Sequence, residues 1–168
     1  MKKLVVYLFI CLCLTVDSNA QEWKIGLNET VPPFEVVQKD GTKTNAEALK
    51  GKVVLINFFA TWCPPCRAEL PRLQAEIWER WKSTGDFHVL VLAREEGWDK
   101  LDPFMAANNY TFPVFPDMER AIFRLFAENT IPRNVLLNRE GEVIYQSIGY
   151  ESKEFDKLIR RIDDELKK

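Results

Sequence analysis

The sequence predicts an α/β fold in which helices cover both faces of a central mixed β-sheet. Residues 53–59 and 87–93 are two nearly continuous apolar runs, and the lack of alternation indicates strands that are buried on both faces. Between them, residues 64–83 carry leucine, isoleucine and tryptophan at helical spacing. A strand, a helix and a strand in this order form a βαβ unit with a right-handed crossover.

The segment before this unit predicts an N-terminal extension of the domain. Residues 34–37 favour a strand, residues 39–42 a turn, and residues 45–49 a short helix. Within the long helix predicted at 64–83, Pro71 lacks the amide hydrogen of a helical residue and should kink it.

Residues 94–115 form a polar and aromatic insert in the centre of the chain. It predicts a short helix that Pro103 either starts or bends, followed by a brief extended piece at 112–115. Residues 119–128 then favour a helix with Ile122, Phe123 and Phe126 facing inward.

The last third of the sequence predicts two strands and a helix. The strands cover residues 134–138 and 143–148, around a hairpin turn at Glu140-Gly141. The helix that follows 151 has a single apolar stripe and a charged face. The complete order is therefore βαβ followed by an antiparallel ββα, within one domain at residues 21–168.

Composition excludes several classes of protein. The chain has 168 residues, 46% of them hydrophobic, with 23 basic and 25 acidic side chains. A net charge of −2 provides no basic face for nucleic acid. One histidine and four cysteines are too few for a disulfide-stapled miniprotein or a zinc-rich module, so we expect no metal site.

The first twenty residues have the pattern of a cleaved signal peptide. A positive start at Lys2-Lys3 is followed by an apolar run over residues 4–14 and by small residues at 18 and 20. The run is well short of the roughly 20 apolar residues that a membrane-spanning helix needs. We therefore predict export to the periplasm or cell envelope of a bacterium after cleavage behind Ala20. The alternative, a lipoprotein, would require a small-residue box before Cys11 or Cys13, and the sequence has none.

Removal of this segment leaves one pair of cysteines, Cys63 and Cys66, separated by two prolines. In an oxidising compartment such a pair tends to form a disulfide. A loop this small constrains the unfolded chain little, so stabilisation is a poor reason for it. The pair follows a buried strand and opens a helix, where free amides and the helix dipole favour a thiolate. This position predicts an exposed, attacking Cys63 and a more buried, resolving Cys66.

The surrounding sequence is similar to the exported, TlpA/ResA-like branch of the thioredoxin-fold thiol–disulfide oxidoreductases. The resemblance covers most of residues 25–168, and the segment that carries it is Gly51-Lys52-Val53-Val54-Leu55-Ile56-Asn57-Phe58-Phe59-Ala60-Thr61-Trp62-Cys63-Pro64-Pro65-Cys66. A Cys-x-x-Cys after a strand, behind a tryptophan and with a later X-Pro, is far more specific than a bare Cys-x-x-Cys. The resemblance implies a thioredoxin-like fold.

The resemblance also implies further site residues. Ile131-Pro132 occupies the position of the family's cis-proline loop, which offers its backbone to the substrate, and Trp62 lies on the substrate-facing rim. Glu69 matches a glutamate that tunes the active site through proton transfer or cysteine pKa, although a solvated helix carboxylate is an equally good interpretation. Asn57 stands where many thioredoxins carry a buried aspartate, so proton shuttling by that position is not expected.

The function that follows is reduction of protein disulfides by dithiol exchange at Cys63 and Cys66, with preparation of apocytochrome c cysteines for haem attachment as one implied role. Exchange needs no bound cofactor, only protein disulfide substrates and a membrane or soluble thiol electron donor. No histidine lies between the cysteines, which favours a reductant or an isomerase-like protein over a primary oxidase. Two alternatives are a thiol peroxidase of the related peroxiredoxin class and a non-enzymatic cell-envelope binding module with a structural disulfide.

Overall fold

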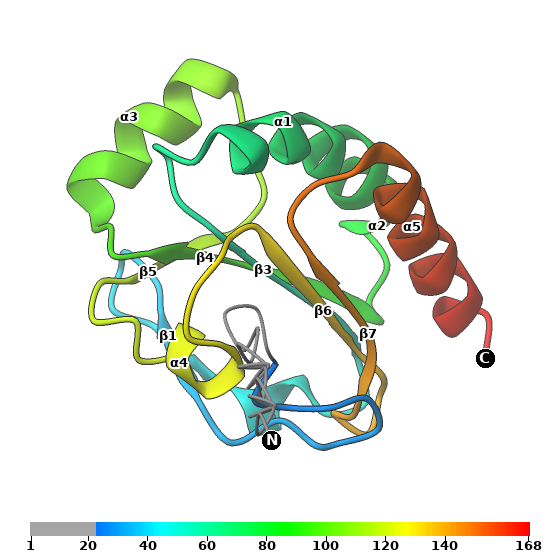
Figure 1. Cartoon of the computed structure of the whole chain (residues 1–168). Helices are drawn as coiled ribbons and strands as arrows, with labels where there is room; N and C mark the ends of the chain where they lie inside the picture. Colours follow the sequence, from blue (N-terminus) through cyan, green and yellow to red (C-terminus); the bar gives the residue numbers. More distant parts are fainter. Residues whose placement is uncertain (1–22) are drawn as a thin grey trace, which may run out of the picture.

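The computed structural model describes residues 23–168, so the signal peptide predicted at 1–20 lies outside the described residues. A five-stranded mixed sheet in the order β5-β4-β3-β6-β7 forms the centre of the molecule (Figure 1). β3 pairs in parallel with β4 and antiparallel with β6. The strands are β3 (Val53–Phe59), β4 (Phe87–Arg94), β5 (Val114–Asp117), β6 (Arg133–Leu137) and β7 (Val143–Ile148).

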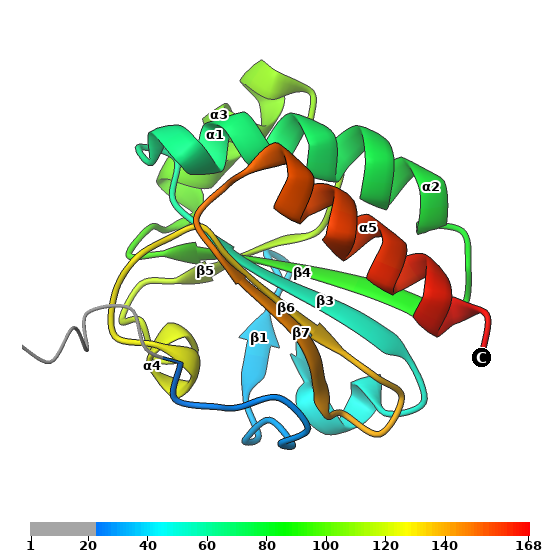
Figure 2. The ribbon, with the colours of Figure 1, turned by 45° about the vertical axis from the view of Figure 1, so that its right-hand side comes forward.

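Helices cover both faces of this sheet, as the sequence predicts. Figure 2 shows the long helical segment that begins with α1 and ends with α2, together with α5, on one face, and α4 on the other. The helices are α1 (Pro64–Arg72), α2 (Glu79–Trp81), α3 (Trp98–Asn108), α4 (Phe123–Phe126) and α5 (Ser152–Leu166). Every residue of β3 is fully or almost fully buried, which explains why its sequence is apolar without alternation.

The N-terminal extension lies on the same face as α4. It contains a small antiparallel sheet of β1 (Glu35–Val37) and β2 (Lys43–Asn45), followed by a 3₁₀ helix, η2 (Ala46–Leu49). β2 is absent from the sequence prediction, because three polar residues carry no strand pattern.

Two predicted helices need correction. The central insert is helical from Trp98, so Pro103 lies inside α3 and does not start it. The helix predicted at 119–128 is reduced to α4, because Arg120 adopts a left-handed backbone with φ 57° and ends any helix through that residue.

Pro71 lies inside α1, one residue before that helix ends, and the kink expected there stays a prediction. α1 runs to Arg72, a π-helical segment, η3 (Leu73–Trp78), follows, and α2 completes the element. Proline removes a backbone donor and crowds the preceding turn, whereas the π-helical segment begins two residues after Pro71. The element is continuous, with Leu70, Leu73 and Ile77 buried against the sheet.

Candidate active site

The two cysteines lie where β3 ends and α1 begins, and they form a disulfide. Cys63 is the N-cap residue of α1, and its Sγ accepts a hydrogen bond of 3.3 Å from the Cys66 amide. Pro64 and Pro65 have no amide hydrogen, so Cys66 supplies the first available donor of the helix. The backbone thus directs a donor and the positive end of the helix dipole at Cys63 Sγ, an arrangement that stabilises negative charge on this sulfur.

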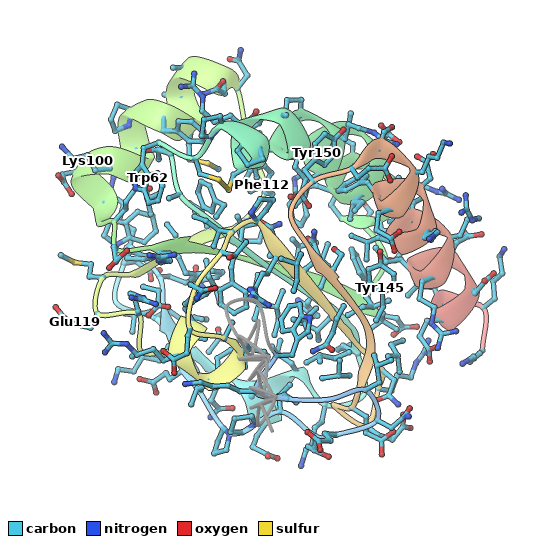
Figure 3. The ribbon with its side chains drawn as sticks, viewed as in Figure 1. Trp62, Lys100, Phe112, Glu119, Tyr145 and Tyr150 are labelled. Carbon is cyan, nitrogen blue, oxygen red and sulfur yellow. A yellow bond between two sulfur atoms is a disulfide. The ribbon has the colours of Figure 1, made fainter. Side chains whose placement is uncertain are left out.

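Burial of the cysteines differs from the expectation. Cys66 is fully buried as predicted, but Cys63 retains only 3% exposure, so the prediction of an exposed Cys63 is wrong for the disulfide form. The backbone of the loop before β6 covers it, with the Ile131 carbonyl oxygen 3.7 Å from Cys63 Sγ. Trp62 is 58% exposed, and Figure 3 shows it on the side of the disulfide that faces α3.

The loop before β6 brings the X-Pro pair to the cysteines. The peptide bond between Ile131 and Pro132 is cis. Both residues are buried, while Thr130 before them is half-buried and has a left-handed backbone with φ 61°. Since β6 pairs antiparallel with β3, the start of β6 and the end of β3 lie at the same edge of the sheet.

Glu69 is 1% exposed, which removes the interpretation as a solvated carboxylate. Its Oε1 accepts a hydrogen bond from Asn134 Nδ2 and a longer one, 3.5 Å, from Asn57 Nδ2. Asn57 also donates to Asn134 Oδ1 at 2.9 Å. Within the part of the chain described, Glu69 Oε2 has no hydrogen-bond partner.

This environment changes the proton affinity of the carboxyl group. Burial raises the pKa of Glu69 to about 7, and the hydrogen bond from Asn134 offsets only part of that effect. No cation of residues 23–168 forms an ion pair with this carboxylate, and its hydrogen-bond donors are the neutral amides of Asn134 and Asn57. Glu69 can therefore hold or release a proton at neutral pH, one helical turn from Cys66.

A second buried carboxylate holds the segment before the cysteines. Glu96, which lies between β4 and α3, is 6% exposed. Its Oε2 accepts from the Thr61 amide at 2.6 Å and its Oε1 from the Thr61 hydroxyl at 2.5 Å. Both oxygens thus bind one residue, two positions before Cys63.

Sequence reasoning missed Asn134, Glu96 and Arg133. Asn134 carries a usable signal, since a polar residue that begins an apolar strand needs a buried partner. Glu96 carries none, because its contact with Thr61 spans 35 residues. Among residues 23–168, no group of three or more His, Cys, Asp or Glu side chains could hold a metal ion. In the same range, no helix has the length and apolar character to cross a bilayer.

Known proteins are similar to this chain in sequence and in fold. The redoxin family model matches residues 27–161. The thiol-disulfide oxidoreductase ResA of Bacillus anthracis is 30% identical over 135 residues, covering 80% of this chain and 77% of its own. ResA of Bacillus subtilis strain 168 is 33% identical over 115 residues, 67% of this chain and 62% of its own.

Solved structures agree. A candidate protein disulfide isomerase from Bacteroides thetaiotaomicron superimposes with a TM-score of 0.84 at 32% identity, covering 89% of this chain and 95% of its own. A candidate thiol:disulfide interchange protein DsbE from Chlorobium tepidum gives 0.75 at 25% identity, with coverages of 84% and 99%.

Proposed function

The chain belongs to the redoxin family and is a thiol–disulfide oxidoreductase, and on this basis we propose that it reduces protein disulfides outside the cytoplasm of a bacterium. One observation carries the proposal: a two-cysteine disulfide caps the N-terminus of α1, where the Cys66 amide and the helix dipole would stabilise a thiolate on Cys63 in the reduced form. Relatives named thiol-disulfide oxidoreductase favour this function over a peroxidase or a structural disulfide.

In the reduced enzyme, the Cys63 thiolate attacks one sulfur of the substrate disulfide. A Cys63–substrate disulfide forms, and the other substrate sulfur leaves as a thiolate that takes up a proton. The Cys66 thiolate then attacks Cys63 Sγ, which releases the second substrate thiol and leaves the Cys63–Cys66 disulfide. The substrate gains two electrons and the enzyme loses two, so a thiol electron donor, membrane-bound or soluble, must reduce the enzyme again.

Glu69 is suited to accept the proton of Cys66 in the second step. Cys66 is buried away from water, so its thiol needs an internal base. A carboxyl group with a pKa of about 7 gains and loses protons in the range where such transfer is efficient. Trp62, Ile131 and Pro132 would bind the substrate, the tryptophan by its exposed ring and the loop by its backbone.

The direction and place of the reaction rest on further sequence features. The absence of a histidine between the cysteines favours a reductant, because that residue stabilises the reduced form of strong oxidants. The signal-like residues 1–20 support export to the periplasm or cell envelope. The resemblance to the TlpA/ResA-like branch supports apocytochrome c cysteines as one substrate class.

A trapping experiment tests the exchange mechanism. Cys66→Ser removes the resolving thiol, so mixed disulfides between Cys63 and substrate proteins should accumulate and resolve on a non-reducing gel. The matched control is Cys63→Ser, which leaves only the buried Cys66 and should trap nothing. Equal adducts from both variants, or none from Cys66→Ser, would show that Cys63 is not the nucleophile.

A second measurement tests direction and export. In growing cells, alkylation of free thiols should find most of the Cys63–Cys66 pair reduced if the protein is a reductant. N-terminal sequencing of the secreted form should begin at Gln21. A pair that is fully oxidised while its partners are also oxidised would contradict the reductive role.

A further inference from the structure

Arg133, directly after the cis-proline, is a charged side chain buried inside the protein. Its exposed fraction is 0%, and its backbone pairs with Phe58 of β3 and Ile148 of β7. Nε donates to the carbonyl oxygens of Thr130 at 2.9 Å and Asn129 at 3.1 Å. The guanidinium thus binds the backbone of the loop that leads to Ile131 and Pro132.

The N-terminal segment covers the other side of this guanidinium. The ring of Trp23 lies 4.4 Å from Arg133 Cζ, a distance typical of a cation–π contact. Trp23 is itself fixed by a β-bridge to Ala127, near the start of the same loop. Arg133 therefore lies between the loop backbone and an aromatic ring, both of which suit a planar, weakly hydrated cation.

The loop needs such support because of Thr130. A β-branched residue with a φ of 61° is a conformational outlier, whose cost the surrounding structure must offset. The Thr130 carbonyl is one of the two that Arg133 binds. The next carbonyl along the chain, that of Ile131, is the one beside Cys63 Sγ.

Stability alone is a poor explanation for a charge at this position. Removing a cation from water is costly, and replacing buried charges by apolar residues of similar volume is often neutral or stabilising. Arg133 binds carbonyl groups of the loop beside the reactive sulfur, so a role in fixing the conformation of that loop explains the buried charge better.

We propose that Arg133 is a positioning residue, which holds the 129–132 backbone so that the Ile131 peptide can receive the substrate chain beside Cys63. This inference rests on the proposed function, since it assigns Arg133 to the binding of the disulfide substrate. The proposal distinguishes the reactivity of Cys63, which depends on the start of α1, from the KM for an extended substrate, which depends on the loop.

The test compares a peptide substrate with a small one. Arg133→Met keeps most of the side-chain length but loses the charge and the donors. We expect the KM for a disulfide-bonded peptide of about ten residues to rise about tenfold, with kcat within about twofold. The rate with 5,5′-dithiobis(2-nitrobenzoate), which is too small to need the loop, should stay within about twofold.

Val135→Ala is the matched control. Val135 is fully buried on the same face of β6, two residues further on, so its truncation weakens packing without removing a loop contact. We expect a lower Tm and an unchanged KM. Arg133→Lys retains the charge without the planar fork, and its KM should lie between those of the wild type and Arg133→Met.

The outcomes distinguish the two proposals. An unchanged peptide KM in Arg133→Met, or an equal rise in Val135→Ala, would overturn the positioning role. If Arg133→Met does not fold, an unchanged KM in Arg133→Lys overturns it equally. A wild-type protein that exchanges with neither substrate would instead refute the proposed function.

Discussion

Two buried glutamates near the dithiol differ in what surrounds their carboxylates. Glu96 uses both oxygens on the amide and hydroxyl of Thr61. Glu69 faces the amide groups of Asn57 and Asn134 through one oxygen. Two donors on one residue, Thr61, suit an anchor, whereas burial among neutral amide groups suits a group that exchanges protons. Both residues are glutamates, so the difference between an anchor and a proton-exchanging group comes from their surroundings.

The raised pKa of Glu69 predicts a pH-dependent stability. Its folded value is about 7 against an ordinary 4.5. Between these values the folded state holds the proton and the unfolded state does not, so the free energy of unfolding falls as pH rises and levels off above about 7. The loss is about 3 kcal/mol. Glu69→Gln mimics the protonated form and should remove this slope.

Urea unfolding of the oxidised protein between pH 4 and pH 8 measures the effect. The difference in unfolding free energy between Glu69→Gln and the wild type isolates this carboxyl from other titrating groups. A difference that stays constant over the range would contradict the assignment. In single-turnover exchange, Glu69→Gln should also slow release of the substrate from its mixed disulfide with Cys63, because the Cys66 thiol loses the base that accepts its proton.

For Glu96 we predict that the rate of disulfide exchange depends on its hydrogen bonds to Thr61 more than on its negative charge. Glu96→Ala removes both anchors of Thr61 and should lower kcat/KM for disulfide exchange about tenfold. Glu96→Gln can still accept from the Thr61 amide and donate to its hydroxyl, so it should retain most activity. Asn138→Ala is the control, because Asn138 accepts from the amides of Glu140 and Glu142 at the opposite end of the sheet. If it slows exchange as much as Glu96→Ala, the effect is general loosening.

At this scale, local sequence predicted the cysteines but not their surroundings. Cys63 and Cys66 are recognisable because motif, strand and helix start are contiguous. Asn134 lies 65 positions from Glu69, so only the pairing of β6 with β3 brings them together. The burial of Cys63 was likewise hidden, because the loop that covers it comes from residue 131.

Among the elements, α4 shows how a helix of only four residues is held in place. Asp117, which is 5% exposed at the end of β5, accepts from the amides of Ile122 at 3.1 Å and Phe123 at 2.8 Å. These amides would otherwise lack partners at the helix start. The rings of Phe123 and Phe126 then pack on Phe58, with centroids 5.3 and 5.2 Å away.

Removing this cap should destabilise the protein measurably. We expect Asp117→Ala to lower the free energy of unfolding by about 1–2 kcal/mol, because two buried amides lose their acceptor. Asp117→Asn keeps one oxygen acceptor and should lose less. Chemical denaturation measures both variants, and equal losses would indicate that the charge is what matters.

Element prediction succeeded where burial is uniform and failed where the backbone turns unexpectedly. The apolar runs predicted β3 and β4 because strands covered on both faces admit few polar residues. The helix through 119–128 failed at Arg120, whose left-handed backbone is set by the Asp117 turn and not by helix propensity. Propensity is a weak guide when tertiary contacts fix one φ angle.

The whole molecule is two helical layers on one sheet, and apart from the few buried charges described above its ion pairs lie on the surface. The pair between Lys157 and Glu154 is representative, with side chains 58% and 40% exposed. Leu158, the next residue after Lys157, is fully buried. Two neighbouring residues of α5 thus allow the contribution of a surface ion pair to be compared with that of core burial.

We predict that stability follows the core and not these pairs. Leu158→Ala should lower the free energy of unfolding by about 2–5 kcal/mol, because it leaves a cavity between α5 and the sheet. Lys157→Ala should change it by less than about 1 kcal/mol, and added salt should abolish that small effect. A salt-sensitive loss comparable with that of Leu158→Ala would contradict this prediction.

The alternation of side chains along β6 has an evolutionary consequence. The side chain of Arg133 lies on the face of the sheet that Trp23 covers, and that of Asn134 lies on the opposite face, against Glu69 of α1. Inserting or deleting one residue here would exchange the two faces, removing the loop support and the amide partner of Glu69 in a single event. Descendants of this chain should therefore vary in length at the turn between β6 and β7, and hardly ever between Pro132 and Val135.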